Sequence, residues 1–160
     1  MPIQLSKMQN PDTAILTVDE LNEAIFKHLG TRNFIINKGR TSSDPDIRAV
    51  KFDVELIIES RGNQASKNKG NDIVFDSSQL DIHLSEHVIQ MMKFQQSVSS
   101  ANQLVFIMVM PDIVRLRERV KKIDKGLDTL NIVRVWVDNL ENIRCEGNIE
   151  AKLIVEELFK

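Results

Sequence analysis

The stretch from Pro45 to Arg61, PDIRAVKFDVELIIESR, decides how this chain is expected to fold. Apolar and charged residues alternate between Ile47 and Glu59, which predicts extended backbone in two adjoining strand segments, because successive side chains of a strand point to opposite faces. The face expected to point inward carries Phe52, Val54, Leu56 and Ile58. The face expected to line a cleft or meet solvent carries Asp53, Glu55, Glu59 and Arg61.

Two acidic positions stand near the ends of this stretch. Asp46 follows Pro45, and thirteen positions later Glu59 is followed by Ser60 and Arg61. An acid near the start of one strand and an acid-x-Lys/Arg step at the end of the next can converge on one divalent metal ion. The pattern therefore indicates a metal site of the kind that phosphodiesterases use. Two acids on one strand face are also typical of a solvated sheet edge, and that alternative stays open here.

Helices and strands are expected to alternate along the rest of the chain. Thr17 and Glu20 form a capping box ahead of an amphipathic helix. The predicted helices cover residues 17–29, about 85–97, 112–127 and 149–159, and the further predicted strands cover 33–37, 73–75, 104–110 and 132–137. The run Leu104–Met110 is apolar on both faces, as expected for a central strand of a covered sheet. This order predicts an α/β fold in one domain over residues 1–160, with an arm at 1–16, a core at 17–140 and a C-terminal helix within 141–160.

Composition limits the kinds of partner. The net charge of −2 excludes a cationic field over the whole surface, so any contact with nucleic acid must come from a local patch. The single cysteine, Cys145, cannot form an internal disulfide. The first residues lack the pattern of a signal peptide, and the longest apolar run is far shorter than the roughly 20 residues that span a bilayer. We expect a soluble, cytoplasmic protein that does not bind a membrane.

The order of the elements, with Pro45-Asp46 and Glu59-Ser60-Arg61 on consecutive strands, resembles the PD-(D/E)xK nuclease superfamily over residues 17–140. The resemblance implies a restriction-endonuclease-like fold, in which helices flank a mixed β-sheet. It also implies an endonuclease that hydrolyses DNA phosphodiester bonds with Mg²⁺ (or Mn²⁺). The metal ligands that it implies are Asp46, Glu59 and the Ser60 carbonyl, and Glu23 on the first helix is a further candidate because Glu20 already serves the capping box.

Arg61 stands where the superfamily prefers lysine. Arginine stays charged at every relevant pH and cannot act as a base, but it can stabilise charge at a phosphate. Arg61 therefore remains a candidate catalytic residue, while a displaced lysine (Lys51, Lys67, Lys69 or Lys93) is an alternative. The same departure favours a second interpretation, a non-catalytic nuclease-fold module that binds nucleic acid or protein.

Basic residues near the acidic pattern are candidates for DNA contact, because lysine and arginine neutralise backbone phosphates. The candidates are Arg40, Lys67, Lys69 and Lys93. Arg115, Arg119 and Lys122 share one face of a later predicted helix, where a solvated face is favoured over phosphate contact. A homodimer is an open alternative, since many nucleases pair to cut both strands.

A different site is suggested by His83-Leu84-Ser85-Glu86-His87, which fits the zinc-protease pattern H-x-x-E-H. Two histidines four residues apart on a helix would share a face and bind Zn²⁺, with Glu86 as base. Ser85 is interpreted as a helix N-cap, which would place His83 outside the helix, and no third ligand stands out. A zinc hydrolase is therefore a minor alternative, beside an α/β interaction module without any site.

Overall fold

Two sheets and five α-helices make up the protein, whose computed structural model describes all of residues 1–160. The elements follow in the order β1 (Ile3–Gln4), the 3₁₀ helix η1 (Leu5–Lys7), α1 (Val18–Gly30), β2 (Ile35–Lys38), β3 (Ile47–Lys51), β4 (Val54–Ser60), the 3₁₀ helix η2 (Ser66–Asn68), β5 (Ile73–Val74), α2 (Ser77–Ser97), β6 (Gln103–Pro111), α3 (Val114–Lys121), α4 (Asp124–Thr129), β7 (Ile132–Val137), β8 (Ile143–Glu146) and α5 (Ile149–Leu158). None of these helices is both long and apolar enough to cross a lipid bilayer.

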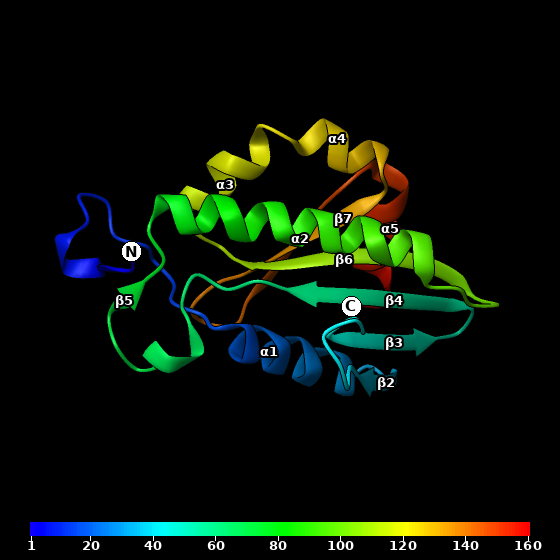
Figure 1. Cartoon of the computed structure of the whole chain (residues 1–160). Coiled ribbons are helices and arrows are strands. Elements are labelled where there is room, and N and C mark those ends of the chain that lie inside the picture. Colours follow the sequence, from blue (N-terminus) through cyan, green and yellow to red (C-terminus); the bar gives the residue numbers. More distant parts are fainter.

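The main sheet has six strands in the order β2-β3-β4-β6-β7-β8. Strands β4, β6 and β7 run parallel to one another, and the remaining neighbours pair antiparallel. Helices lie on both sides of the sheet (Figure 1). On one side α1 and α5 meet where the His28 ring lies 3.0 Å from the Phe159 carbonyl, and on the other α2 and α3 are joined by an ion pair between Asp81 and Arg119. The predicted α/β class with a mixed sheet flanked by helices is thus confirmed.

Strands β3 and β4 form a hairpin, in which Ile47 pairs with Ile58. The prediction of two adjoining strand segments is therefore correct, but the inward position predicted for Phe52 is wrong. Phe52 lies in the turn with a φ of 56° and is 83% exposed. The turn interrupts the alternation, so positions before and after it are not on one continuous strand.

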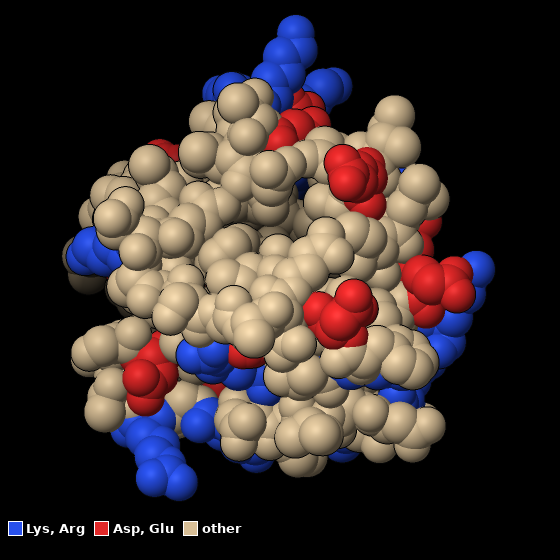
Figure 2. All heavy atoms as spheres, turned by 90° about the vertical axis from the view of Figure 1, so that its right-hand side faces the viewer, with Lys and Arg blue, Asp and Glu red and all other residues tan.

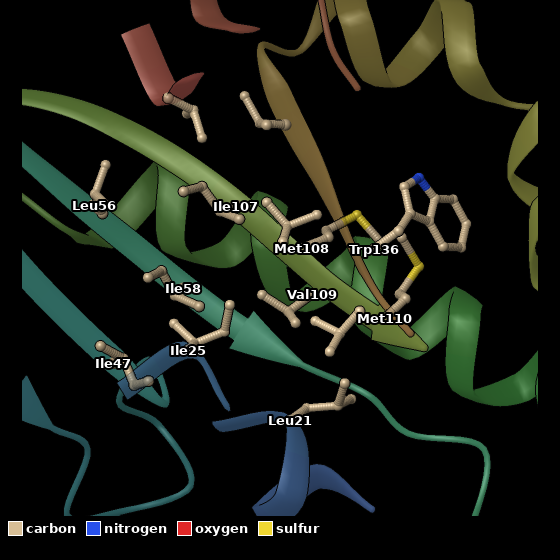
Figure 3. Close-up of a cluster of buried hydrophobic side chains, with 14 of the residues drawn as sticks. Leu21, Ile25, Ile47, Leu56, Ile58, Ile107, Met108, Val109, Met110 and Trp136 are labelled. Atoms are coloured by element: carbon tan, nitrogen blue, oxygen red, sulfur yellow. The ribbon is translucent and has the colours of Figure 1, made fainter. Parts of the chain in front are cut away.

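The core lies on both faces of strand β6, which is central as predicted and is buried from Ile107 to Met110. Figure 3 shows that side chains of α1 and the hairpin gather on one side of the sheet and that Trp136 lies on the other. The labelled residues are Leu21, Ile25, Ile47, Leu56, Ile58, Ile107, Met108, Val109, Met110 and Trp136. Because β6 offers no polar face to water, it fits only where helices cover the sheet on both sides.

The segment before α1 is held against the end of β4 instead of forming a loose arm. The Asn63 side chain accepts a hydrogen bond from the Leu16 N–H at 2.9 Å and donates to the Ala14 carbonyl at 2.8 Å. A Cβ on Gly62 would lie 2.1 Å from the Leu16 carbonyl oxygen, so only glycine allows this close approach. The predicted capping box of Thr17 and Glu20 then starts α1. The chain is thereby fixed where β4 leaves the sheet.

Several predicted element bounds are wrong. Helix α2 begins at Ser77 with Asp76 as N-cap, so Ser85 lies inside the helix. The predicted helix over 112–127 is divided into α3 and α4. Strand β2, predicted over 33–37, runs from Ile35 to Lys38 as the exposed edge of the sheet, and Ile35 is 70% exposed. Strand β8 is an additional edge strand, so the main sheet continues past residue 140.

Candidate active site at the ends of β3 and β4

Asp46 and Glu59 lie opposite each other at one end of the β3–β4 hairpin. The Asp46 N–H donates to Glu59 Oε1 at 3.1 Å, and the Ser60 N–H donates to Asp46 Oδ2 at 3.0 Å. At this end of the paired strands, the two carboxylates therefore accept hydrogen bonds from backbone N–H groups that have no partner in the strand pairing. The structure brings these two acids together as the sequence pattern predicts, and each carboxylate keeps one oxygen that no backbone N–H binds.

Glu59 is buried, which corrects the expectation that it lies on a face open to a cleft or solvent. Its exposed fraction is 4%, because helix α2 covers this side of the sheet. Burial and, after it, the nearby Asp46 carboxyl raise the pKa of Glu59 to about 8, against the opposing effects of the Arg61 charge and the Asp46 N–H. Glu55 is buried as well, but it is paired with Arg48 and not with Asp46.

Arg61 lies beside the same carboxylate. Its Nη1 is 3.5 Å from Glu59 Oε2 and 3.4 Å from the Ser60 carbonyl oxygen. The Ser60 hydroxyl instead donates to Asn22 Oδ1 on α1 at 2.7 Å. The guanidinium thus contacts two of the three groups that the resemblance implies as metal ligands.

The oxygen donors fit Mg²⁺ or Mn²⁺ in kind, because these hard cations prefer carboxylate and carbonyl oxygens. The donor set is small: two carboxylates and one main-chain carbonyl, and no three His, Cys, Asp or Glu side chains converge anywhere in the chain. Glu23, the additional candidate, is exposed on α1 and lies 3.7 Å from Lys27 Nζ. Glu23 and Asp46 both line a cavity of about 750 Å³ between α1 and the β2–β3 connection.

His87 lies next to the site, although the sequence analysis did not predict that it belongs there. Its imidazole is fully buried, and Nε2 lies 2.9 Å from the Glu59 carbonyl oxygen, so Nε2 carries the proton and donates. Nδ1 has no hydrogen-bond partner. Burial, with a smaller effect of the Arg61 charge, lowers the pKa of His87 to about 3, although the hydrogen bond to the Glu59 carbonyl opposes the shift. His87 shares its buried helix face with Leu80, Met91 and Phe94. This helical spacing is the sequence pattern that could have predicted the burial of His87.

The side chains of the H-x-x-E-H pattern do not converge on one metal position. His83 and His87 both lie within α2, so the prediction that Ser85 starts the helix after His83 is wrong. His83 is partly exposed and lies 3.8 Å from Glu86 Oε2, whereas His87 is engaged with the Glu59 carbonyl. Zinc ligation through His87 Nε2 would require this bond to break.

The four basic residues proposed for DNA contact are all exposed. Arg40 lies in the β2–β3 connection, and Lys93 of α2 lines a cavity of about 530 Å³ together with Ser42 and Ser43 of that connection. Lys67 belongs to η2 and Lys69 follows it, in the loop after β4. Figure 2 shows the molecule from the right-hand side of Figure 1, where the centre of the surface is uncharged and lysines and arginines stand mostly near the margins.

The three arginines of α3 form ion pairs within the protein. Arg115 pairs with Asp12 at 2.5 Å, and Arg119 pairs with Asp81 at 2.7 Å. Arg117 pairs with Asp112. These pairs favour a structural role for the stretch over phosphate contact.

Comparisons with protein-family models, with the curated proteins and with the solved structures found no match for this chain. The functional interpretation therefore rests on the geometry of Asp46, Glu59, Ser60 and Arg61.

We expect His87 to limit stability in acid. A buried base with a lowered pKa stays neutral in the folded chain while the unfolded chain takes up a proton below pH 6.5, so stability falls as pH falls from 6.5 toward 3. The loss at pH 5 is about 2 kcal/mol. His87→Gln, whose amide can still donate to the Glu59 carbonyl, should lose about 2 kcal/mol less than wild type between pH 7 and pH 5 in urea unfolding. The partly exposed His83→Gln serves as control, and an equal acid sensitivity of wild type and His87→Gln would refute the assignment.

Proposed function

We propose that this protein is a metal-dependent endonuclease that hydrolyses DNA phosphodiester bonds. The observation that carries the proposal is the meeting of Asp46 and Glu59 at the ends of adjacent antiparallel strands, where the pKa of Glu59 is raised to about 8. Strongly shifted carboxyl groups beside a second acid are more frequent in functional sites than elsewhere, because a structural role alone gives little reason to place a second acid beside a buried one.

The arrangement of the elements supports the finer proposal of a restriction-endonuclease-like fold. Apart from the short η2 and β5 segments after β4, the chain places one helix, three antiparallel strands, a second helix and a parallel strand in succession, as α1, β2 to β4, α2 and β6. Pro45-Asp46 leads into β3 and Glu59-Ser60 ends β4, which are the positions that the resemblance to the PD-(D/E)xK superfamily implies.

In this proposal Asp46, Glu59 and the Ser60 carbonyl hold Mg²⁺ or Mn²⁺, with Glu23 as an additional ligand from α1. The cation would lower the pKa of a bound water and offset the charge that develops on the phosphate. Arg61 contributes a fixed positive charge for the same phosphate, since it cannot accept a proton. Arg40, Lys67, Lys69 and Lys93 would contact the DNA backbone on either side of the site.

A second candidate is a nuclease-fold module that binds nucleic acid or protein without cutting. The contact between Arg61 and Glu59 favours it, because a guanidinium 3.5 Å from Glu59 Oε2 already occupies the carboxylate oxygen that a metal would need. A homodimer that presents two such sites to a duplex remains part of both proposals.

Substitution of Arg61 tests the catalytic proposal. Arg61→Ala should lower kcat by a factor that corresponds to roughly 2–4 kcal/mol, because it removes a charge that stabilises the transition state. Arg61→Lys should keep or raise activity, since it restores the residue that the superfamily prefers. The assay is Mg²⁺- or Mn²⁺-dependent cleavage of branched, duplex and single-stranded DNA at low salt, because phosphate binding weakens steeply as salt rises.

The matched control is Arg144→Ala on β8, which removes an exposed arginine that pairs with Glu146 and should leave kcat unchanged. If neither wild type nor Arg61→Lys cuts any of these substrates, and neither binds Mn²⁺, the binding-only candidate is the better one.

A further inference from the structure

The guanidinium of Arg61 is already in contact with the oxygens that a divalent cation would need. Its Nη1 lies 3.5 Å from Glu59 Oε2 and 3.4 Å from the Ser60 carbonyl oxygen. Glu59 Oε2 is also the oxygen of that carboxylate that accepts no backbone hydrogen bond, because Oε1 accepts from the Asp46 N–H. A guanidinium and a divalent cation cannot both sit against these two oxygens.

We propose that Arg61 and a divalent cation compete for Glu59 and the Ser60 carbonyl, so that Arg61 limits metal affinity and is displaced when a cation binds. This inference rests on the proposed function and adds a regulatory role for the residue in which the chain departs from the superfamily pattern. When Glu59 loses its proton, Arg61 provides the positive charge that the buried carboxylate requires, since an isolated buried charge is costly.

The contacts of Arg61 are of a kind that a cation can replace. Charge-assisted hydrogen bonds of arginine normally measure about 2.7–2.9 Å, and both Arg61 contacts are longer. The Arg61 side chain is 27% exposed, so its guanidinium can turn toward solvent without unpacking the core. Arg115 shows the opposite arrangement: it is 14% exposed, and its Nη2 lies 2.5 Å from a buried Asp12 oxygen. The contacts of Arg61 with Glu59 and the Ser60 carbonyl can therefore be broken more easily than the ion pair of Arg115.

Displacement would also couple two functions of one residue. A guanidinium that leaves Glu59 remains tethered at the end of β4, next to the cation. There it can meet the phosphate that the cation binds, so loading of the site and the contact of Arg61 with substrate would be linked.

Mn²⁺ binding measured by isothermal titration calorimetry tests the competition directly. Arg61→Gln should bind Mn²⁺ roughly tenfold more tightly than wild type, as expected when a competing contact worth about 1.4 kcal/mol is removed. Arg61→Lys should fall between the two. Arg144→Gln makes the same substitution on β8, at the far edge of the sheet, and should leave Mn²⁺ affinity within about twofold of wild type in 0.3 M KCl, where long-range charge effects are screened.

The outcomes separate this inference from the proposed function. If wild type binds Mn²⁺ and Arg61→Gln binds it no more tightly, the competition is refuted while the metal site stands. If Arg144→Gln gains as much affinity as Arg61→Gln, the overall charge of the protein, and not competition, explains the gain. If none of the variants binds Mn²⁺, the metal-dependent function itself fails. Circular dichroism melting curves establish that each variant is folded.

Discussion

Glu59→Gln is expected to reduce metal-dependent DNA cleavage by roughly 10³-fold, a loss of about 4 kcal/mol of transition-state stabilisation. Glutamine has the shape of glutamate, and its carbonyl oxygen can still accept the hydrogen bond from the Asp46 N–H. It lacks the negative charge that holds Mg²⁺, however, so the site keeps its structure and loses its cation. Single-turnover cleavage and Mn²⁺ calorimetry on the same preparation measure both losses.

The matched control is Glu55→Gln on the same strand. Glu55 is as buried as Glu59, but its partner is Arg48. We expect Glu55→Gln to cleave DNA at the wild-type rate and to unfold more easily, because it leaves the Arg48 charge without its partner. Unchanged cleavage by Glu59→Gln, or equal losses for both variants, would remove Glu59 from the proposed site.

The meeting of Asp46 and Glu59 could be predicted from the acidic pattern on two adjoining strands, and the hairpin explains it, because its turn sets the pairing of every residue beyond it. With Phe52 and Asp53 in the turn, Lys51 pairs with Val54 and Ile47 with Ile58, which leaves Asp46 opposite Glu59. The turn itself was missed, since neither of its central residues is glycine or asparagine, the residues that usually mark a tight hairpin.

The burial of Glu59 could not be predicted in the same way. Alternation along a strand shows which side chains share a face, but it does not show whether a helix covers that face. Helix α2 covers it here, and its start was placed too late because Asp76 and Ser85 are both acceptable N-caps. The start at Ser77 places His87 on the buried face beside Glu59. Strand β8 escaped prediction because it is a four-residue edge strand with little alternation.

The second large effect that we expect is a loss of stability as pH rises, caused by Glu59. An acid whose pKa is higher in the folded chain than in the unfolded chain binds its proton more tightly when folded. The stability that this proton contributes is present below pH 4.5 and is lost as pH rises toward about 8. Since the shift arises mainly from burial and then from Asp46, we expect a loss of about 2–4 kcal/mol over this range.

Urea unfolding of wild type and Glu59→Gln at pH 6 and pH 9 isolates this contribution, because the remaining titrating groups, His87 among them, are shared by the two proteins. At pH 6 the variant should already be the more stable protein by part of this loss, because unfolded wild type has released the Glu59 proton there while folded wild type keeps it. At pH 9 the neutral glutamine should make the variant more stable by about 2–4 kcal/mol, although it is the variant expected to lose activity. Mg²⁺ should stabilise wild type more at pH 9 than at pH 6 and should not stabilise the variant, because a cation and a proton compete for the same carboxylate. A variant that is less stable than wild type at pH 9 would show that Arg61 holds Glu59 ionised and that the carboxylate is a structural ion pair.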